Sequence, residues 1–223
     1  MADAVARLAL RRAINQIRYL RPVPPGRADP PAAAVYRQLE ADFGMLAPPI
    51  ALHAPVPELL AASWLMLRES LVADAVLPRA SLETVAAEVS TGNACPYCVT
   101  VHRATEQALG RAGSDREHTA GAQRSEPAGG SAPDSIESWS RLVAHRDTAG
   151  RPPGTAAEAA RLVGVVATFH YLNRLVNVFL APSPLPSALP GPLRAPMLQV
   201  LGRFTGANAG RPHPAGRSLP LLP

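Results

Sequence analysis

Apolar residues recur at intervals of three and four along most of the chain, which predicts α-helices rather than strands. In the segment from Pro57 to Leu77, for example, Leu60, Trp64, Leu67 and Leu71 fall on one helical face. No segment shows the alternation of a half-buried strand. We therefore expect an all-α fold, a single domain of about six to eight helices. The helices are predicted at about 3–20, 32–43, 57–77, 81–92, 95–109, 135–146, 155–179 and 193–205.

The breaks between these segments define the expected organisation. Prolines interrupt the chain after residue 21, and 47–57 is predicted to be an ordered loop. Gly110 is the expected cap of the helix before it. The polar stretch 111–134, rich in Gly, Ala and Ser, has no helical period and is predicted to be a flexible insert. The domain should span 1–205 with its core at about 57–110, and 206–223 should be a disordered tail.

Composition favours helices but not a nucleic-acid partner. Apolar residues make up 47% of the 223 and aromatic residues only 4%, which suits a helical core. The net charge is +5, yet all 22 basic residues are arginines and they are spread along the chain. A surface that follows phosphates would concentrate its charge on one face. We therefore expect no nucleic-acid partner.

Hydropathy argues against a membrane location. The longest apolar stretch, 159–180, is interrupted by His170, Asn173, Arg174 and Asn177. Charges also break every apolar run near the N-terminus, where a secretory signal would need a continuous apolar segment. We expect a protein of the cytoplasm with no membrane contact.

The only cysteines, Cys95 and Cys98, lie in the sequence TGNACPYCVTVHRA at 91–104. Pro96 suits the first position of a helix, so Cys95 falls at the cap and Cys98 in the first turn. There the helix dipole favours thiolates, and both pKa values should fall. His102, four residues after Cys98, shares their helical face. The pattern suits thiol–disulfide chemistry with an imidazole to move the proton.

Two other interpretations of these residues remain open. Zinc could bind Cys95, Cys98 and His102 with a distant fourth ligand, although no second Cys/His pair has the spacing of a zinc knuckle. The thiols could also be small, inert core residues. Spacing alone does not decide which thiol attacks first, since His102 is near Cys98 whereas the dipole favours Cys95, expected to be the more exposed.

The spacing from Glu83 adds a resemblance to a known family. Glu83, eleven residues, Cys95, two residues, Cys98, three residues and His102 is similar to the motif of the alkylhydroperoxidase D branch of the carboxymuconolactone decarboxylase-like family. The resemblance covers 82–110 and implies a helical fold, trimers or larger rings, and hydroperoxide reduction without metal or cofactor. It also implies that Cys98 attacks, Cys95 resolves, and His102 and Glu83 relay the proton.

Several residues around this motif have alternative interpretations. Glu83 could be merely a dipole partner in the first turn of its helix, and Glu88 is the rival carboxylate. Tyr97 departs from relatives that carry a second His between the cysteines, and it could contact the substrate. On the last long helix a polar stripe contains His170 and Arg174; it could be a solvated face, a subunit contact or part of a substrate pocket.

These observations predict a thiol-dependent peroxidase that cycles Cys95 and Cys98 between dithiol and disulfide. Its partners would be a hydroperoxide, a dithiol electron-donor protein and further copies of itself in a trimer or hexamer. The alternative is a non-catalytic module that uses the same residues to sense redox state or to bind zinc. The four other histidines are expected to be superficial or structural. They are His53, His118, His145 and His213.

Overall fold

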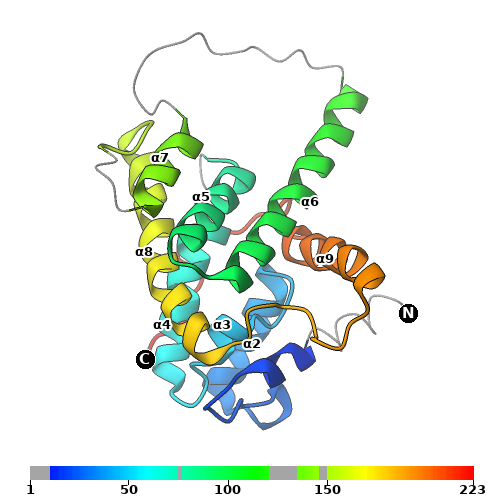
Figure 1. The fold of residues 1–223 in the computed structure, drawn as a ribbon. Coiled ribbons are helices and arrows are strands. Elements are labelled where there is room, and N and C mark those ends of the chain that lie inside the picture. The colour runs from blue at the N-terminus through cyan, green and yellow to red at the C-terminus, as the bar shows by residue number, and fades with distance from the viewer. Residues whose placement is uncertain (1–10, 75–76, 121–134, 146–149) are drawn as a thin grey trace.

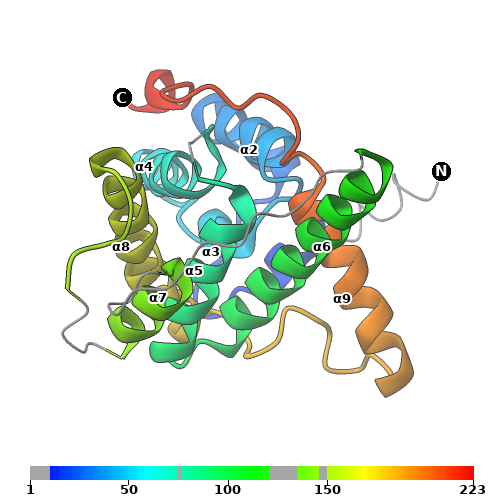
Figure 2. The same cartoon turned by 90° about the horizontal axis from the view of Figure 1, so that it is seen from above.

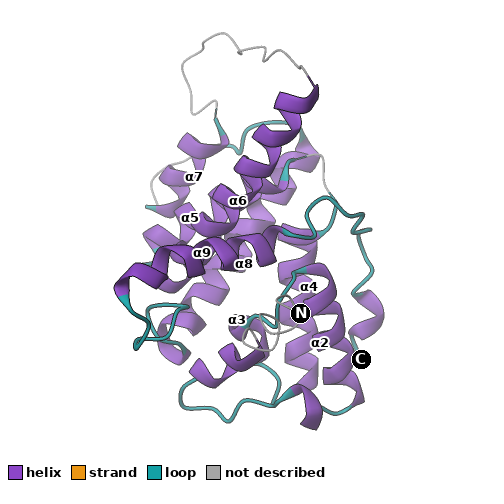
Figure 3. Cartoon of the chain, turned by 90° about the vertical axis from the view of Figure 1, so that its right-hand side faces the viewer, coloured by secondary structure: helices purple, strands orange, loops and turns teal. Residues whose placement is uncertain are grey.

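The computed structural model of the chain describes residues 11–74, 77–120, 135–145 and 150–223. Eight α-helices and no strand occur in these residues, which confirms the expected all-α class (Figures 1 and 3). The start of the predicted first helix, 3–10, and the insert residues 121–134 lie outside this part of the chain. The α-helices are α2 (Pro30–Asp42), α3 (Pro48–Ala51), α4 (Pro57–Leu67), α5 (Arg79–Gly92), α6 (Pro96–Ala120), α7 (Ile136–Ala144), α8 (Ala156–Phe179) and α9 (Gly191–Gly206).

Short-range signals set where several helices begin. Asp29 caps α2 by accepting a hydrogen bond from the backbone N–H of Ala32 at 2.8 Å. At α8 the predicted capping box is present, because the Thr155 side chain accepts from the N–H of Glu158 and the Glu158 carboxylate accepts from the N–H of Thr155. These caps satisfy amides that the helix itself leaves without partners.

Helix α5 is the centre of the fold. It packs against α6, α7 and α8, and α6 packs in turn against α9 (Figures 1 and 2). Two glycines permit close approach: a Cβ at Gly92 would overlap the carbonyl oxygen of Ala144, and one at Gly202 would overlap that of Ala104. The helix that ends just before the cysteines and the helix that begins with them are thus both held firmly in the core.

Three local predictions need correction. Within the described residues the predicted first helix ends in a short 3₁₀ turn, Arg12–Gln16, and the chain is already extended at Ile17 instead of continuing to residue 20. The predicted loop 47–57 contains the short helix α3. Gly110 does not end a helix, since α6 runs through it to Ala120 and extends past the other helices (Figures 1 and 3). A single glycine costs a helix only about 1 kcal/mol, so it did not have to stop there.

The C-terminal residues 206–223 are ordered against the rest of the fold, in contrast to the disordered tail expected there. The carbonyl of Pro214 accepts from Nη1 of Arg68 at 3.0 Å, and the backbone N–H of Gly216 donates to Glu69 at 2.9 Å. His213 is buried. Figure 2 shows this last segment beside α2 and α4. A few long-range hydrogen bonds therefore order a segment whose composition alone suggested disorder.

Among the described residues one helix, α8, is long and apolar enough to cross a membrane by length and composition alone. However, 44% of its apolar window is buried inside the fold, and core helices of soluble proteins pass the same test. A single such helix is weak evidence for a membrane span.

Candidate active site

A tight turn between α5 and α6 places Cys95. The backbone N–H of Cys95 donates to Ser90 O at 2.9 Å, and that of Ala94 donates to Thr91 O at 3.0 Å. This pair of hydrogen bonds is a Schellman motif, which ends a helix with one residue in the left-handed conformation. That residue is Ala94, with φ of 49°. An alanine pays a steric cost in this conformation that glycine would not.

Cys95 is the N-cap of α6, as its spacing from Pro96 predicted. Its carbonyl accepts from Val99 N at 3.0 Å. Hydrogen bonds to its sulfur from the Cys98 thiol and the Cys98 backbone N–H lower the pKa of Cys95 against the opposing effect of burial. The expectation of an exposed Cys95 is wrong, because the residue is only 1% exposed.

Cys98 is also buried, and its pKa moves in the other direction. Burial raises the pKa of the Cys98 thiol well above its ordinary value, and the neighbouring Cys95 raises it further. The expectation that both pKa values fall is therefore wrong for Cys98. Both cysteines are free thiols. In the dithiol state the negative charge thus favours Cys95, with the Cys98 thiol as its hydrogen-bond donor.

His102 is fixed by a buried carboxylate on the neighbouring helix. Its Nδ1 lies 2.6 Å from Oε2 of Glu83, and its ring meets the Phe169 ring edge-on with centroids 4.5 Å apart. Since Nδ1 donates to the carboxylate, Nε2 is the nitrogen left to accept a proton. The expected pairing of His102 with Glu83 is direct and involves no bridging water.

Arg79 holds the other oxygen of the same carboxylate. Its Nε donates to Oε1 of Glu83 at 2.7 Å, one helical turn away on α5. Burial disfavours the charged form of Glu83, but the charges of Arg79 and His102 outweigh it, so the pKa of Glu83 falls below its ordinary value. The chain therefore carries an ordered series from Arg79 through Glu83 to His102. Sequence analysis missed Arg79, whose only signal was its position four residues before Glu83.

A cavity of about 680 Å³ opens onto Cys98 and His102. The residues at its buried end include Phe43, Leu67 and Phe169, whereas Arg12 and Met197 lie at its exposed end. Cys95 does not line it. The lining is almost entirely apolar, so the site suits an organic molecule better than a small hydrophilic one.

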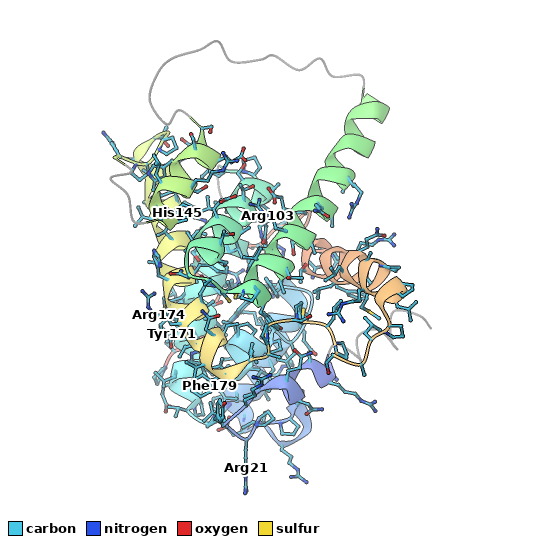
Figure 4. All side chains as sticks on the ribbon, viewed as in Figure 1. Arg21, Arg103, His145, Tyr171, Arg174 and Phe179 are labelled. Carbon is cyan, nitrogen blue, oxygen red and sulfur yellow. The ribbon has the colours of Figure 1, made fainter. Side chains whose placement is uncertain are left out.

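The three side chains expected to contact the substrate differ in position. Tyr97 lines the cavity and is buried. His170 and Arg174 are not among the lining residues. Arg174 projects outward from α8 in Figure 4 and donates back to the carbonyl of His170. The cavity gives no support to a substrate contact by His170 or Arg174.

The polar stripe on α8 does connect to the site, through Asn173. This residue is completely buried and hydrogen-bonded to both Asn93 and Ser90 at 3.0 Å. Hydrogen bonding from its side chain favours the ionised form of both thiols, although burial still raises the pKa of Cys98 above its ordinary value. The stripe was described from sequence, but its spacing could not reveal that α8 faces the turn before Cys95.

The structure gives no support to two alternatives, Glu88 as the partner of His102 and a zinc site at the cysteines. Glu88, the rival of Glu83, is ion-paired with Arg103 on α6 instead of with His102. In the part of the chain that the structure describes, no three Cys, His, Asp or Glu side chains are arranged to hold a metal ion. The zinc alternative required such an arrangement of Cys95, Cys98 and His102, and the geometry does not provide it.

Similarity to a known protein helps to assign the chain to a family. The chain is 33% identical over 205 residues, 91% of its length, to a curated Mycobacterium tuberculosis protein named alkyl hydroperoxide reductase. It spans only 57% of that protein. No family profile and no solved structure matches the chain. Together with the spacing of Glu83, Cys95, Cys98 and His102, this similarity supports the assignment of the chain to the alkylhydroperoxidase D-like branch of the carboxymuconolactone decarboxylase-like family.

Proposed function

We propose that the chain is a thiol-dependent peroxidase that reduces organic hydroperoxides with Cys98 as the attacking thiol. The observation that carries this proposal is the position of Cys98 and His102 together on the wall of an apolar cavity. A nucleophile must reach its substrate, and Cys95 does not line that cavity. The name of the similar mycobacterial protein supports the same class of reaction.

In the first step His102 Nε2 takes the proton of the Cys98 thiol. The thiolate then attacks the terminal oxygen of the hydroperoxide, so that a sulfur–oxygen bond forms and the oxygen–oxygen bond breaks. The departing alkoxide receives a proton from the His102 imidazolium and leaves as an alcohol. Glu83 stabilises the imidazolium through Nδ1, and Arg79 keeps Glu83 ionised. The high pKa of Cys98 makes this base necessary.

In the second step the Cys95 thiolate attacks the Cys98 sulfenic acid. A disulfide forms, the sulfur–oxygen bond breaks, and the oxygen leaves as hydroxide, which becomes water by taking a proton from the solvent. The lowered pKa of Cys95 suits this role, because it increases the fraction of the resolving thiol that is ionised. A dithiol electron donor finally reduces the disulfide and becomes oxidised itself, which closes the cycle without metal or cofactor.

We further propose that the chain works as a homo-oligomer, a trimer or hexamer, in the cytoplasm. The family resemblance supports oligomerisation. Large apolar side chains also remain exposed on α9, where Leu193 is 52% and Met197 42% exposed in the single chain. Met197 lies at the cavity, so a second copy that covers α9 would also shape the entrance to the site.

The test is hydroperoxide consumption by the purified chain with dithiothreitol as donor and cumene hydroperoxide as substrate. Cys98→Ser should abolish turnover, and Cys95→Ser should allow at most one stoichiometric round. His102→Phe should slow turnover by ~100-fold or more, since general-base catalysis contributes on this scale. Undiminished turnover in Cys98→Ser would show that Cys98 is not the nucleophile.

A redox sensor that uses the same cysteines is the second candidate. The observation in its favour is that the two thiols are only 1% and 3% exposed, so a protein donor cannot reach them without movement of the surrounding helices. Such a sensor would form the disulfide once with peroxide and show no multiple turnover with any donor. The steady-state assay therefore separates the two functions.

A further inference from the structure

A second cavity, distinct from the one at Cys98, lies where α6 and α9 meet the start of α5 and the segment after α9. Its volume is about 840 Å³, within the range of roughly 300–1,000 Å³ common for small-molecule sites. Four arginines line it, and no carboxylate does among the residues described. The arginines are Arg79, Arg111, Arg203 and Arg211.

Among the side chains that the structure describes, three of these arginines have no carboxylate partner. Arg79 is paired with Glu83, but the side chains of Arg111, Arg203 and Arg211 have no hydrogen bond or ion pair with any group whose position the structure describes. Some other arginines of the fold do have carboxylate partners, namely Arg11, Arg68, Arg103 and Arg141. A group of like charges around one cavity is unfavourable until an anion neutralises it.

The chemistry of the lining indicates which anion. Guanidinium groups present paired N–H donors that match the oxygens of phosphate, and several of them together favour more than one negative charge. Apart from Gln199, the rest of the wall is small and apolar, with Leu109 and Ala112 on α6 and Ala80 on α5. We propose that this cavity binds a small organic diphosphate, with its phosphates on Arg111, Arg203 and Arg211 and its organic part against Leu109.

The cavity is less suited to a nucleic acid. Proteins that follow single strands stack bases on aromatic side chains, and none lines this cavity in the described part of the chain. The arginines also gather around one cavity, whereas a strand needs an extended track of charge.

This inference does not depend on the proposed peroxidase function, although one residue connects the two sites. Arg79 lines the second cavity and also holds the carboxylate that fixes His102. The three unpaired arginines make no contact with the Cys98 cavity, so variants at these positions test ligand binding without altering the thiols or the relay.

The test is isothermal titration of the purified chain with ADP and, separately, with pyrophosphate. Wild type should bind both saturably, and Arg203→Gln/Arg211→Gln should weaken the binding by at least ~10-fold, the equivalent of about 1.4 kcal/mol. The control pair is Arg21→Gln/Arg37→Gln, which removes the same charge from exposed positions outside the cavity. Arg21 points away from the fold in Figure 4. The affinity of this control variant for ADP and for pyrophosphate should equal that of wild type.

A second measurement uses only wild type, so it tests the proposal even if the Arg203→Gln/Arg211→Gln variant folds poorly. In wild type, ADP should protect Arg203 and Arg211 from modification by phenylglyoxal, as read by mass spectrometry, and should leave Arg21 unprotected. Absence of saturable binding, equal weakening in both variant pairs, or binding to single-stranded DNA without binding to ADP or pyrophosphate would each overturn the proposal.

Discussion

Nδ1 of His102 on α6 lies 2.6 Å from Oε2 of Glu83 on α5, and both side chains are buried. The contact joins two helices whose relative position is fixed by the short turn that also carries Cys95. The orientation of the imidazole is therefore a property of the fold and not of a mobile side chain. Its consequences can be tested through charge, stability and substrate size.

The first prediction concerns the charge of the relay. Glu83→Gln keeps a side-chain oxygen beside His102 but removes the negative charge that stabilises the imidazolium. Hydroperoxide turnover should fall by ~10- to 100-fold, the scale of one proton-transfer contribution. Glu88→Gln is the matched control, because Glu88 pairs with Arg103 instead, and it should retain most of the activity. Equal losses in the two variants would remove Glu83 from the relay.

The second prediction concerns stability and pH. The pKa of Glu83 lies below its ordinary value of 4.5 in the folded chain, so the folded state holds fewer protons than the unfolded state near that pH. The stabilisation that the ionised Glu83 gives to the folded state is complete above about pH 4.5. It is lost as the pH falls through the pKa that Glu83 has in the folded state.

Urea unfolding at several pH values measures this effect. At pH 7 Glu83→Gln should unfold more easily by about 3 kcal/mol, because it leaves the largely buried Arg79 guanidinium without its counter-charge. The difference from wild type should shrink as the pH is lowered below 4.5. A difference that stays constant down to acid pH would show that Glu83 is not held ionised by its neighbours.

Much of the site could be predicted because its residues are close together in sequence. Cys95, Cys98 and His102 are brought to one face by a single helix, and the motif spacing added Glu83 one helix earlier. Asn173 could not be predicted in the same way, because helical spacing defines a face of α8 but not the helix that this face contacts. Its contact with Asn93 spans 80 residues, and only tertiary packing creates it.

The fold shows the same division between local and long-range information. The capping box at Thr155 and the proline at the start of α4 act within one helical turn, so sequence located these starts well. Gly110 was misjudged because a single glycine does not have to end a helix, and the tail was misjudged because composition indicates only average behaviour. The tail is ordered by specific distant partners, such as the buried Arg68.

The third prediction separates the two thiols by acidity. In Cys98→Ser the remaining Cys95 keeps its capping position, and the serine hydroxyl can still donate to it, so its pKa should lie below the ordinary 9.0. In Cys95→Ser the remaining Cys98 should titrate above 9.0, because burial is the main cause of its shift. The pH dependence of alkylation by iodoacetamide measures both. The reverse order of pKa values would assign the resident thiolate to Cys98.

The fourth prediction concerns the turn that precedes Cys95. Ala94 has φ of 49°, a conformation in which glycine has no steric penalty. Ala94→Gly should therefore raise the free energy of unfolding by about 1 kcal/mol. Ala62→Gly, in the middle of α4, is the control and should lower it by about 1 kcal/mol. Thermal or urea unfolding of the two variants gives the comparison, and destabilisation by both would show that the Ala94 conformation is not strained.

The last prediction uses the apolar cavity to test the size of the substrate. Ala47 is buried and lines this cavity, so Ala47→Phe should fill part of the space in front of Cys98. The KM for cumene hydroperoxide should rise by ~10-fold or more, the effect expected from a steric block worth about 1.4 kcal/mol. The rate with hydrogen peroxide, which needs little room, should change far less. Ala195→Phe, at an exposed position of α9 outside the cavity, should leave both rates unchanged. If Ala47→Phe instead slowed the two peroxides equally, the cavity would not be the place where the organic group binds.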